Sequence, residues 1–338
     1  MSLNIAVIGP GLVGSAFINQ VKQFQNKKLT LSVIATMNSK KMTLGSSVVD
    51  SNIDKFIEYC NANQPCVIVD STSSESVVTH YPKILQKLHL VTPNKKGFSG
   101  SIDLFNQIKS ASLENNTFCY HEATVGAGLP IISTLNDLVQ TGDEITKIEG
   151  IFSGTLSFIF NRFSQIGGSN VSFSQTVKEA KELGYTEPDP RDDLNGLDVA
   201  RKVVILGRVS GLPLSLDTLQ IENIVPKELR EADASTFMEQ LSNYDDYFSK
   251  LNKEALESKS VLRYVGCVDP NGSSVALKKF DASHPFASLK GSDNIIAFYT
   301  KRFPNPLIVQ GAGAGAEVTA FGMFSDVLKI AKSMVGPI

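Results

Sequence analysis

The sequence predicts an α/β protein that combines a doubly wound parallel sheet with a second α+β domain, whose sheet is mainly antiparallel. Three observations lead to this prediction. A short apolar run, Leu3–Ile8, leads into the glycine motif Gly9–Gly14 and then into an apolar helical pattern. Apolar residues that alternate with period two are concentrated in the last third of the chain. A length of 338 residues exceeds what most single hydrophobic cores reach, so we expect two domains.

The glycine motif lies between a strand and a helix, where its glycines have separate tasks. They form a tight turn, let the backbone approach a pyrophosphate, and allow close helix–strand packing at a helix N-terminus that favours anions. We therefore expect a dinucleotide site of the Rossmann type. The predicted cofactor contacts in this motif are Gly9, Gly11, Leu12, Val13 and Gly14.

The second expected strand, Leu29–Thr36, is not followed by the acidic residue that usually holds a ribose 2′-hydroxyl. Lys40 and Lys41 follow it instead. A missing carboxylate with lysines nearby suits a 2′-phosphate, so NADP(H) is the preferred cofactor and NAD(H) the alternative. Loop lysines are usually just solvated, and that interpretation stays open.

Polar residues also follow two other expected strands, at the edge where open α/β sheets bind ligands. Asp70–Ser74 follow one strand and Lys95 follows the next. A lysine at such an edge can contact both cofactor and substrate, although a solvated loop charge is equally consistent with the sequence. Further along, Glu122–Pro130 forms a glycine-rich turn with several carbonyl groups available.

The remaining region predicts an antiparallel sheet and one unusually apolar helix. The period-two runs are Ser260–Val268, Val275–Phe280, Ile295–Lys301 and Leu307–Val309. Before them, strand Ile145–Phe152 leads into helix Thr155–Phe163, which is too apolar to face water alone. We expect this helix to contact a second subunit, with burial in its own domain as the alternative. After Gly311–Ala316, a last helix should return to the first domain.

These patterns divide the chain into two predicted domains. A dinucleotide-binding domain takes residues 1–148 plus 309–338, and a substrate-binding, catalytic and dimerisation domain takes residues 149–308.

The stretch Gly184–Lys202 is the strongest candidate for chemistry, because it carries five carboxylates and three cations within nineteen residues. Pro188 and Pro190 prevent a helix in its first half. A helical pattern follows, in which Asp198 and Lys202 lie one turn apart on the same face. The alternative is an ordinary surface ion pair worth ~0.3 kcal/mol.

Composition excludes several classes of protein. A net charge of −2 gives no basic field for nucleic acid or an anionic membrane. No stretch reaches the roughly 18 apolar residues that a transmembrane helix needs. The N-terminus has no basic leader, and the cysteines show no metal-type spacing, so free thiols and a cytoplasmic location are expected. The four cysteines are Cys60, Cys66, Cys119 and Cys267.

Taken together, seven blocks of the sequence resemble homoserine dehydrogenase of the short fungal type, which has no fused kinase. The blocks are GPGLVGSAF, TPNKK, HEATVGAGLP, EGIFSGTLSFIFN, GYTEPDPRDDLNGLDVARK, HPFASLKGSDN and QGAGAGAEVTA. The resemblance runs essentially from end to end. It implies NAD(P)(H)-dependent interconversion of L-homoserine and L-aspartate 4-semialdehyde, within the synthesis of threonine, methionine and isoleucine.

The same resemblance implies roles for individual residues. Lys202 would donate and accept the proton at the substrate oxygen, Asp198 would orient the substrate, and Lys95 would lie near the nicotinamide and the substrate. The implied substrate-binding residues are Glu187, Asp193 and Asp198, with Glu187 taking the ammonium group. Further implied cofactor contacts are Thr72, Ser73, Lys95 and Gly315.

The resemblance also implies a monovalent cation, expected to be sodium, in the glycine-rich turn. Its ligands would be mostly backbone carbonyls, which suit a hard cation. The implied positions are Glu122, Val125, Ala127 and Leu129. Two residues depart from the family pattern, since Pro10 should stiffen the phosphate turn and Glu317 stands where a small residue is expected. We expect no feedback control by threonine through a regulatory domain.

Two rival functions remain to be tested. A phosphorylating semialdehyde dehydrogenase needs an activated cysteine with a histidine base. Cys119, two residues before His121, is the one candidate for it and is predicted to be a buried core thiol. A non-enzymatic NADP-sensing module would keep the glycine motif, but it has no need for the charged groups of Glu187–Lys202.

Overall fold

The computed structural model describes residues 2–335 and divides the chain into two compact units. One unit comprises the residues up to Ser133 together with those from Ala314, and the other spans Thr134–Gly313. The predicted domain boundaries, 148/149 and 308/309, differ from the boundaries of these two units. The reason is strand pairing, because β8 (Ile145–Ile151) and β13 (Leu307–Ala312) both hydrogen-bond to β12 (Asp293–Thr300) of the second unit.

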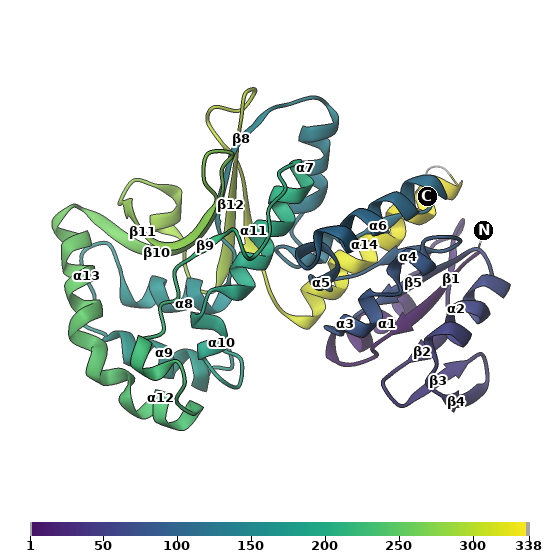
Figure 1. The fold of residues 1–338 in the computed structure, drawn as a ribbon, viewed down its shortest axis with the longest axis horizontal. Helices are drawn as coiled ribbons and strands as arrows, with labels where there is room; N and C mark the ends of the chain where they lie inside the picture. Colours follow the sequence, from purple (N-terminus) through teal and green to yellow (C-terminus); the bar gives the residue numbers. More distant parts are fainter. Residues whose placement is uncertain (1, 336–338) are drawn as a thin grey trace. The chain divides into compact units, whose positions relative to one another are not determined.

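The first unit is built on a seven-stranded sheet with the strand order β4-β3-β2-β1-β5-β6-β7 (Figure 1). Its strands are β1 (Ser2–Ile8), β2 (Thr30–Met37), β3 (Lys41–Leu44), β4 (Ser47–Asp50), β5 (Cys66–Asp70), β6 (His89–Val91) and β7 (Cys119–Tyr120). β2, β1, β5, β6 and β7 run parallel. The chain passes from β1 to β2 on one side and later to β5 on the other. The strand order thus reverses beside β1, where doubly wound sheets bind ligands.

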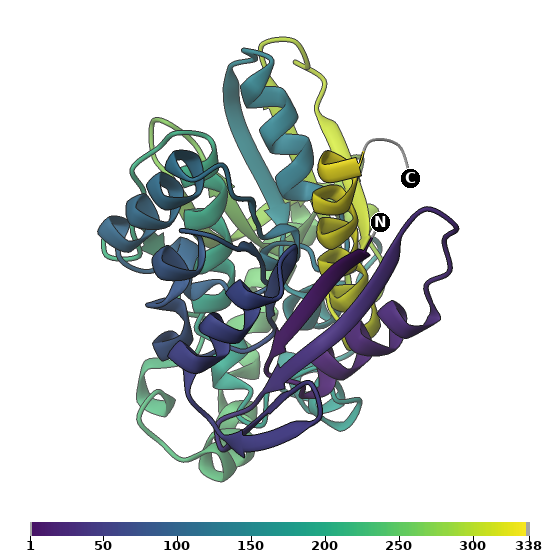
Figure 2. The same cartoon turned by 90° about the vertical axis from the view of Figure 1, so that its right-hand side faces the viewer.

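Helices α1 and α14 pack together in the first unit, so the last helix returns to this unit as predicted. Phe324 of α14 meets Phe17 and Phe24 edge-to-face, with ring centroids 6.3 and 5.5 Å apart. Figure 2 shows α14, in yellow, beside the purple N-terminal segment. The helices of this unit are α1 (Leu12–Gln23), α2 (Ile53–Ala62), α3 (Glu75–Val78), α4 (Tyr81–Ile84), α5 (Lys96–Ser99), α6 (Ile102–Glu114), η1 (Glu122–Thr124) and α14 (Ala316–Val335). Helix α7 (Ile131–Gln140) begins here and continues into the second unit.

The hairpin β3–β4 was not among the predicted elements. It extends the sheet beyond β2 by antiparallel pairing, and it turns at Gly45, whose φ is +58°. Such a backbone conformation favours glycine. In the sequence, the Gly-Ser pair between two short runs was the available signal of this hairpin.

The second unit has a six-stranded sheet with the order β13-β12-β8-β10-β11-β9. Its pairings are antiparallel except for that of β9 with β11, which confirms the predicted mainly antiparallel sheet. Its remaining strands are β9 (Gln220–Ile221), β10 (Ser260–Val268) and β11 (Ser274–Asp281). Its helices are α8 (Gly154–Phe163), α9 (Phe173–Glu182), α10 (Arg191–Leu194), α11 (Leu197–Val209), η2 (Lys227–Leu229), α12 (Ala234–Gln240), η3 (Leu241–Tyr244), α13 (Asp245–Glu257) and η4 (Pro285–Ser288).

The apolar helix α8 packs into the core of its own unit. Leu156, Ile159 and Phe160 are at most 1% exposed. Phe158 is partly buried and lies against Tyr185, with ring centroids 4.8 Å apart. The burial of these side chains within one chain accounts for the composition of the helix. The helix therefore gives no argument for a second subunit, contrary to the sequence-based expectation.

Glycine allows α11 to lie directly against β10. A Cβ atom at Gly266 would lie 2.5 Å from Val203 Cγ2 and 3.0 Å from the ring of Phe152. The helix that carries Asp198 and Lys202 is therefore fixed against the strand β8–helix α8 junction by close packing. No helix within residues 2–335 is both long and apolar enough to span a membrane.

Candidate active site

The ammonium group of Lys202 is buried on α11 and held by two oxygen atoms. Lys202 Nζ donates to the carbonyl of Phe152 at 2.6 Å and lies 2.7 Å from Asp198 Oδ2. The side chain of Lys202 is 9% exposed and that of Asp198 is 46% exposed. An ammonium removed from water needs such partners, because its desolvation is otherwise costly. The pair is therefore not the surface ion pair that the spacing alone allowed.

Asn294 binds the same carbonyl oxygen as Lys202. Its Nδ2 donates to Phe152 O at 3.1 Å, and its side chain is fully buried. Gly313 makes room for it, because a Cβ atom there would overlap the Asn294 amide. Among the residues that the structure describes, Asn294 Oδ1 has no hydrogen-bond partner. A buried oxygen of this kind is normally satisfied by water or by a ligand.

The part of the stretch Gly184–Lys202 that precedes α11, here called the acidic loop, brings two of the predicted substrate-binding residues together. Asp193 Oδ2 accepts the backbone N–H of Glu187 at 2.9 Å. The Thr155 hydroxyl donates to the carbonyl of Tyr185 at 2.6 Å. Burial raises the pKa of Asp193, and the carboxylates of Glu187 and Asp198 act in the same direction, whereas the hydrogen bond from the Glu187 N–H opposes the shift. The loop is thus anchored to α8 at Thr155.

In the first unit, a cavity of about 610 Å³ is lined by Gly9, Gly11 and Thr72, three of the residues that were expected to contact the cofactor. Gly9 has a φ of +82°, and a Cβ atom there would lie 2.5 Å from Thr72 Cγ2. At Gly14 a Cβ atom would overlap the Gly9 carbonyl, so both positions need glycine. Apart from its own chain neighbours, no atom of the described residues lies within 4 Å of the Cβ position at Gly11. The turn is therefore tight on one side and open on the side where a pyrophosphate could approach.

The other predicted cofactor residues lie outside the lining of this cavity. Leu12 is 83% exposed at the start of α1, and Val13 packs against the core. Ser73 is exposed, although its neighbour Thr72 lines the cavity. Gly315, with a φ of +108°, directly precedes α14, and Lys95 precedes α5.

A buried polar network joins the ends of β5 and β6. Tyr81 Oη donates to Asp70 Oδ2 at 2.5 Å and lies 3.0 Å from Thr92 Oγ1. Asn94 Nδ2 donates to the same carboxylate at 3.3 Å. Burial raises the pKa of Asp70, although the hydrogen bond from Tyr81 opposes the shift. This network fixes the two loops that carry Thr72 and Lys95. In the sequence, the polar residues that follow both strands were the only indication of the network.

Comparison with known proteins decides the family. A model described as "Homoserine dehydrogenase" matches residues 130–328, and one described as "Homoserine dehydrogenase, NAD binding domain" matches residues 9–122. The chain belongs to the homoserine dehydrogenase family. It is 46% identical over 356 residues to homoserine dehydrogenase of Saccharomyces cerevisiae, covering 98% of this chain and 99% of that protein. The Schizosaccharomyces pombe enzyme is 44% identical over 358 residues, covering 97% and 95%. A crystal structure from Candida auris, described as a protein of unknown function, has a TM-score of 0.94 at 45% identity and covers 98% of both chains.

The two departures from the pattern of homoserine dehydrogenases lie in the first unit. Pro10 lines the cavity, in the turn between Gly9 and Gly11. Glu317 accepts a hydrogen bond from Gln20 Nε2 at 3.0 Å, which ties the first turn of α14 to α1. The carboxylate thus contributes to the contact between these helices.

As a homoserine dehydrogenase the protein is an oxidoreductase, and the structure gives the thioester-forming rival no support. Burial raises the pKa of the Cys119 thiol to about 12 and lowers the pKa of His121 to about 4. The thiol therefore stays protonated near neutral pH, although only a thiolate is an effective nucleophile. Cys119 is only partly buried on β7, so it is not the fully buried core thiol that the sequence predicted.

The carboxylate of Glu122 is bound by protein donors. It accepts the backbone N–H of Ile132 at 2.7 Å, at the start of α7, and lies 3.2 Å from Lys329 Nζ. Within residues 2–335 no cluster of three or more His, Cys, Asp or Glu residues suits a metal ion. Gly126 and Ala127 have φ values of +75° and +52°, so the chain reverses sharply there. In this turn backbone carbonyls are the groups that could bind a cation.

We predict that Lys202→Ala lowers turnover about 10²–10⁴-fold, the usual effect of losing a proton-transfer group. Folding and NADPH binding should be retained, because Asp198 is half-exposed and can be solvated once the lysine is gone. Lys178→Ala is the matched control, since Lys178 also forms an i,i+4 pair, with Glu182, but on the exposed surface. Steady-state rates of Lys202→Ala within about threefold of wild type would remove Lys202 from the mechanism.

Proposed function

We propose that the protein catalyses the NADP(H)-dependent interconversion of L-homoserine and L-aspartate 4-semialdehyde, within threonine, methionine and isoleucine synthesis. One observation carries the proposal: a buried ammonium, Lys202, is fixed by Phe152 O and Asp198 beside an acidic loop. Such a group suits proton transfer at a substrate oxygen. The carboxylates of the loop suit the ammonium group of an amino-acid substrate.

The bound nicotinamide supplies or accepts the hydride, and the chain provides positioning and proton transfer. Lys202 gives a proton to the carbonyl oxygen during reduction and takes it from the hydroxyl during oxidation. Asp198 orients the substrate, while Glu187 and Asp193 hold its ammonium group. We assign Lys95 to the same reaction, near the nicotinamide, because of the TPNKK sequence that contains it.

The preference for NADP(H) rests on the residues that follow β2. No residue that lines the cavity in the described chain is acidic, so no carboxylate is available there for a ribose 2′-hydroxyl. Asn38 Oδ1 accepts the backbone N–H groups of Lys40 and Lys41, each at 2.8 Å, and so shapes this turn. The side chain of Lys41 pairs with Asp50 at 2.7 Å. Lys40 is therefore our candidate for the 2′-phosphate.

We also propose a monovalent cation, sodium by family resemblance, at the turn Glu122–Leu129. The consecutive left-handed residues Gly126 and Ala127 support this proposal. Hard cations prefer oxygen ligands, and carbonyls satisfy this preference where the carboxylate is already engaged. The implied ligands are the carbonyls of Glu122, Val125, Ala127 and Leu129.

We propose a homodimer whose interface is the face of the second sheet that points away from α11. Gly266 faces α11, so its neighbour Cys267 and Glu149, the register partner of Cys267, point the other way. Glu149 lies between Lys147 at 3.2 Å and Lys278 at 3.0 Å. On the same face lies Ile308, which pairs with Ala297, the register partner of Glu149, and whose exposed side chain a second copy would bury.

We place the enzyme in the cytoplasm, with small molecules rather than nucleic acids or membranes as its ligands. The four cysteines are free thiols, which suits a reducing compartment.

The reaction itself can be tested with purified protein. L-homoserine should reduce NADP⁺ without added phosphate, which an absorbance assay for NADPH follows. A requirement for phosphate would favour a phosphorylating semialdehyde dehydrogenase. NADP(H) binding without turnover would favour a sensing module.

Lys40→Ala should lower kcat/KM for NADP⁺ by about tenfold and leave that for NAD⁺ unchanged, because a charged hydrogen bond to phosphate is lost. Lys41→Ala is the internal comparison and should have a smaller effect, since its ammonium is paired with Asp50. If neither variant changes the ratio of the two kcat/KM values, this loop does not select the cofactor.

Sedimentation at micromolar concentration tests the dimer. We predict that the wild type sediments as a dimer and that Ile308→Glu sediments as a monomer. Ile308 is 38% exposed and pairs with Ala297, which in turn pairs with Glu149 on the proposed interface. Val48→Glu, at an exposed position in the first unit, should leave the dimer intact. A monomeric wild type would refute the dimer.

A further inference from the structure

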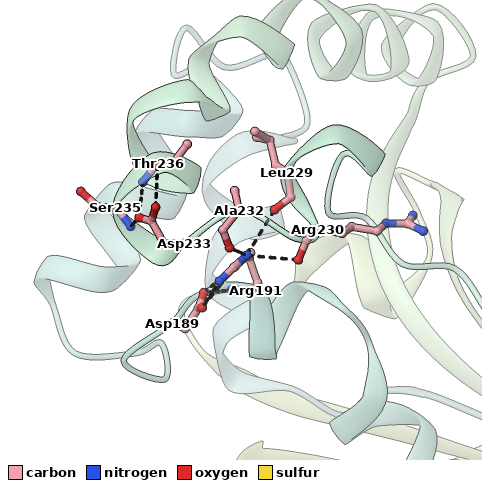
Figure 3. Close-up of polar contacts among 8 residues, drawn as sticks. All are labelled: Asp189, Arg191, Leu229, Arg230, Ala232, Asp233, Ser235 and Thr236. Carbon is pink, nitrogen blue, oxygen red and sulfur yellow. Dashed lines mark hydrogen bonds and ion pairs between the residues drawn. The ribbon is translucent and has the colours of Figure 1, made fainter.

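Arg191, the first residue of α10, joins the acidic loop to a chain segment roughly forty residues away (Figure 3). Its Nε donates to both carboxylate oxygens of Asp189, at 3.0 and 3.1 Å, and its Nη2 lies 2.5 Å from Asp189 Oδ2. Its Nη1 donates to the backbone carbonyls of Leu229 at 3.3 Å, Arg230 at 3.1 Å and Ala232. One guanidinium thus holds both the loop and the segment 229–232.

The segment 229–232 is itself firmly held. Leu229 is 2% exposed, so it anchors the start of the segment in the core. Arg230 Nε donates to the carbonyl of Val225 at 3.1 Å. At the other end, Asp233 caps α12 by accepting the backbone N–H groups of Ser235 and Thr236, each at 2.9 Å (Figure 3). The carbonyls that Arg191 binds are therefore fixed from both sides.

The acidic loop has few other ways to move. Pro188 and Pro190 flank Asp189 and fix their own φ angles. Once Asp189 is bound by Arg191, the residues just outside the two prolines have little freedom. Glu187 lies on one side of this clamp and Asp193 on the other, and the two are linked by the hydrogen bond from Glu187 N to Asp193 Oδ2.

We propose that Arg191 is a positioning residue for substrate recognition: it sets the loop geometry in which Glu187 and Asp193 receive the substrate ammonium group. The proposal rests on the proposed homoserine dehydrogenase activity. Lysine cannot replace arginine here, because an ammonium lacks the planar fork that binds a carboxylate and several carbonyls at once. A loose loop would weaken the binding of substrate while leaving the proton-transfer group Lys202 in place.

The test compares Arg191→Lys with wild type in the oxidation of homoserine. We expect KM for homoserine to rise about tenfold while kcat stays within threefold, because ground-state positioning is lost and the chemistry is retained. The Kd for NADPH, measured by fluorescence, should be unchanged. Arg162→Gln is the matched control, since Arg162 forms an ion pair with Glu179 in the same unit. A purely structural role would instead lower the unfolding temperature and kcat together, or leave KM unchanged, and either result would overturn the proposal.

A double-mutant cycle with Glu187→Gln gives a second readout. If Arg191 acts through the loop carboxylates, the two changes are not additive, and the double variant has nearly the KM of the worse single variant. Additive effects on KM would contradict the proposal even if Arg191→Lys folds poorly. Oxidation of homoserine by the wild type is measured before any variant is made. If the wild type does not oxidise homoserine, the proposed function itself is refuted.

Discussion

A buried ammonium must have fixed oxygen partners, and in the second unit this requirement determines how the helix α11 is placed. Lys202 is paired with Asp198 of its own helix and also donates to the backbone carbonyl of Phe152, where β8 ends. The backbone partner is within reach only if α11 lies very close to the sheet. Gly266 makes this approach feasible, since any larger residue would meet Val203 and Phe152. Packing and electrostatics therefore specify the same position for the lysine.

Two separate contacts hold the acidic loop. They preorganise its carboxylates for the substrate and do not add further charge. Thr155 of α8 binds the carbonyl of Tyr185, and Arg191 binds Asp189 together with the segment 229–232. Side chains ordered before the substrate arrives do not lose their freedom when it binds. In the first unit, the Asp70–Tyr81 contact has a similar effect on the loops that follow β5 and β6. Both units thus use polar contacts, buried in the first unit and partly buried in the second, to fix the residues that would touch ligands.

The sequence predicted those parts of the fold that depend on local pattern. Period-two runs identified β10 to β13, and the glycine motif identified the turn between β1 and α1, because side-chain spacing and glycine conformation are local properties. The i,i+4 spacing placed Asp198 and Lys202 on one helix face, and the resemblance to homoserine dehydrogenase implied their catalytic roles. The carbonyl of Phe152 was not, since every residue has a carbonyl and only the fold brings this one to a lysine 50 positions away. Burial of α8 was also misjudged, because an apolar helix looks the same in sequence whether it meets a second subunit or its own sheet.

The central claim is that Lys202 transfers the proton during the chemical step. Stopped-flow single turnover of enzyme-bound NADPH with L-aspartate 4-semialdehyde tests it most directly. The account predicts that Lys202→Ala binds NADPH with an unchanged signal amplitude but transfers hydride slowly, with a primary isotope effect when the transferred hydrogen is deuterium. A normal single-turnover rate in this variant, with only the steady-state rate reduced, would contradict the claim and place Lys202 in a binding or release step instead.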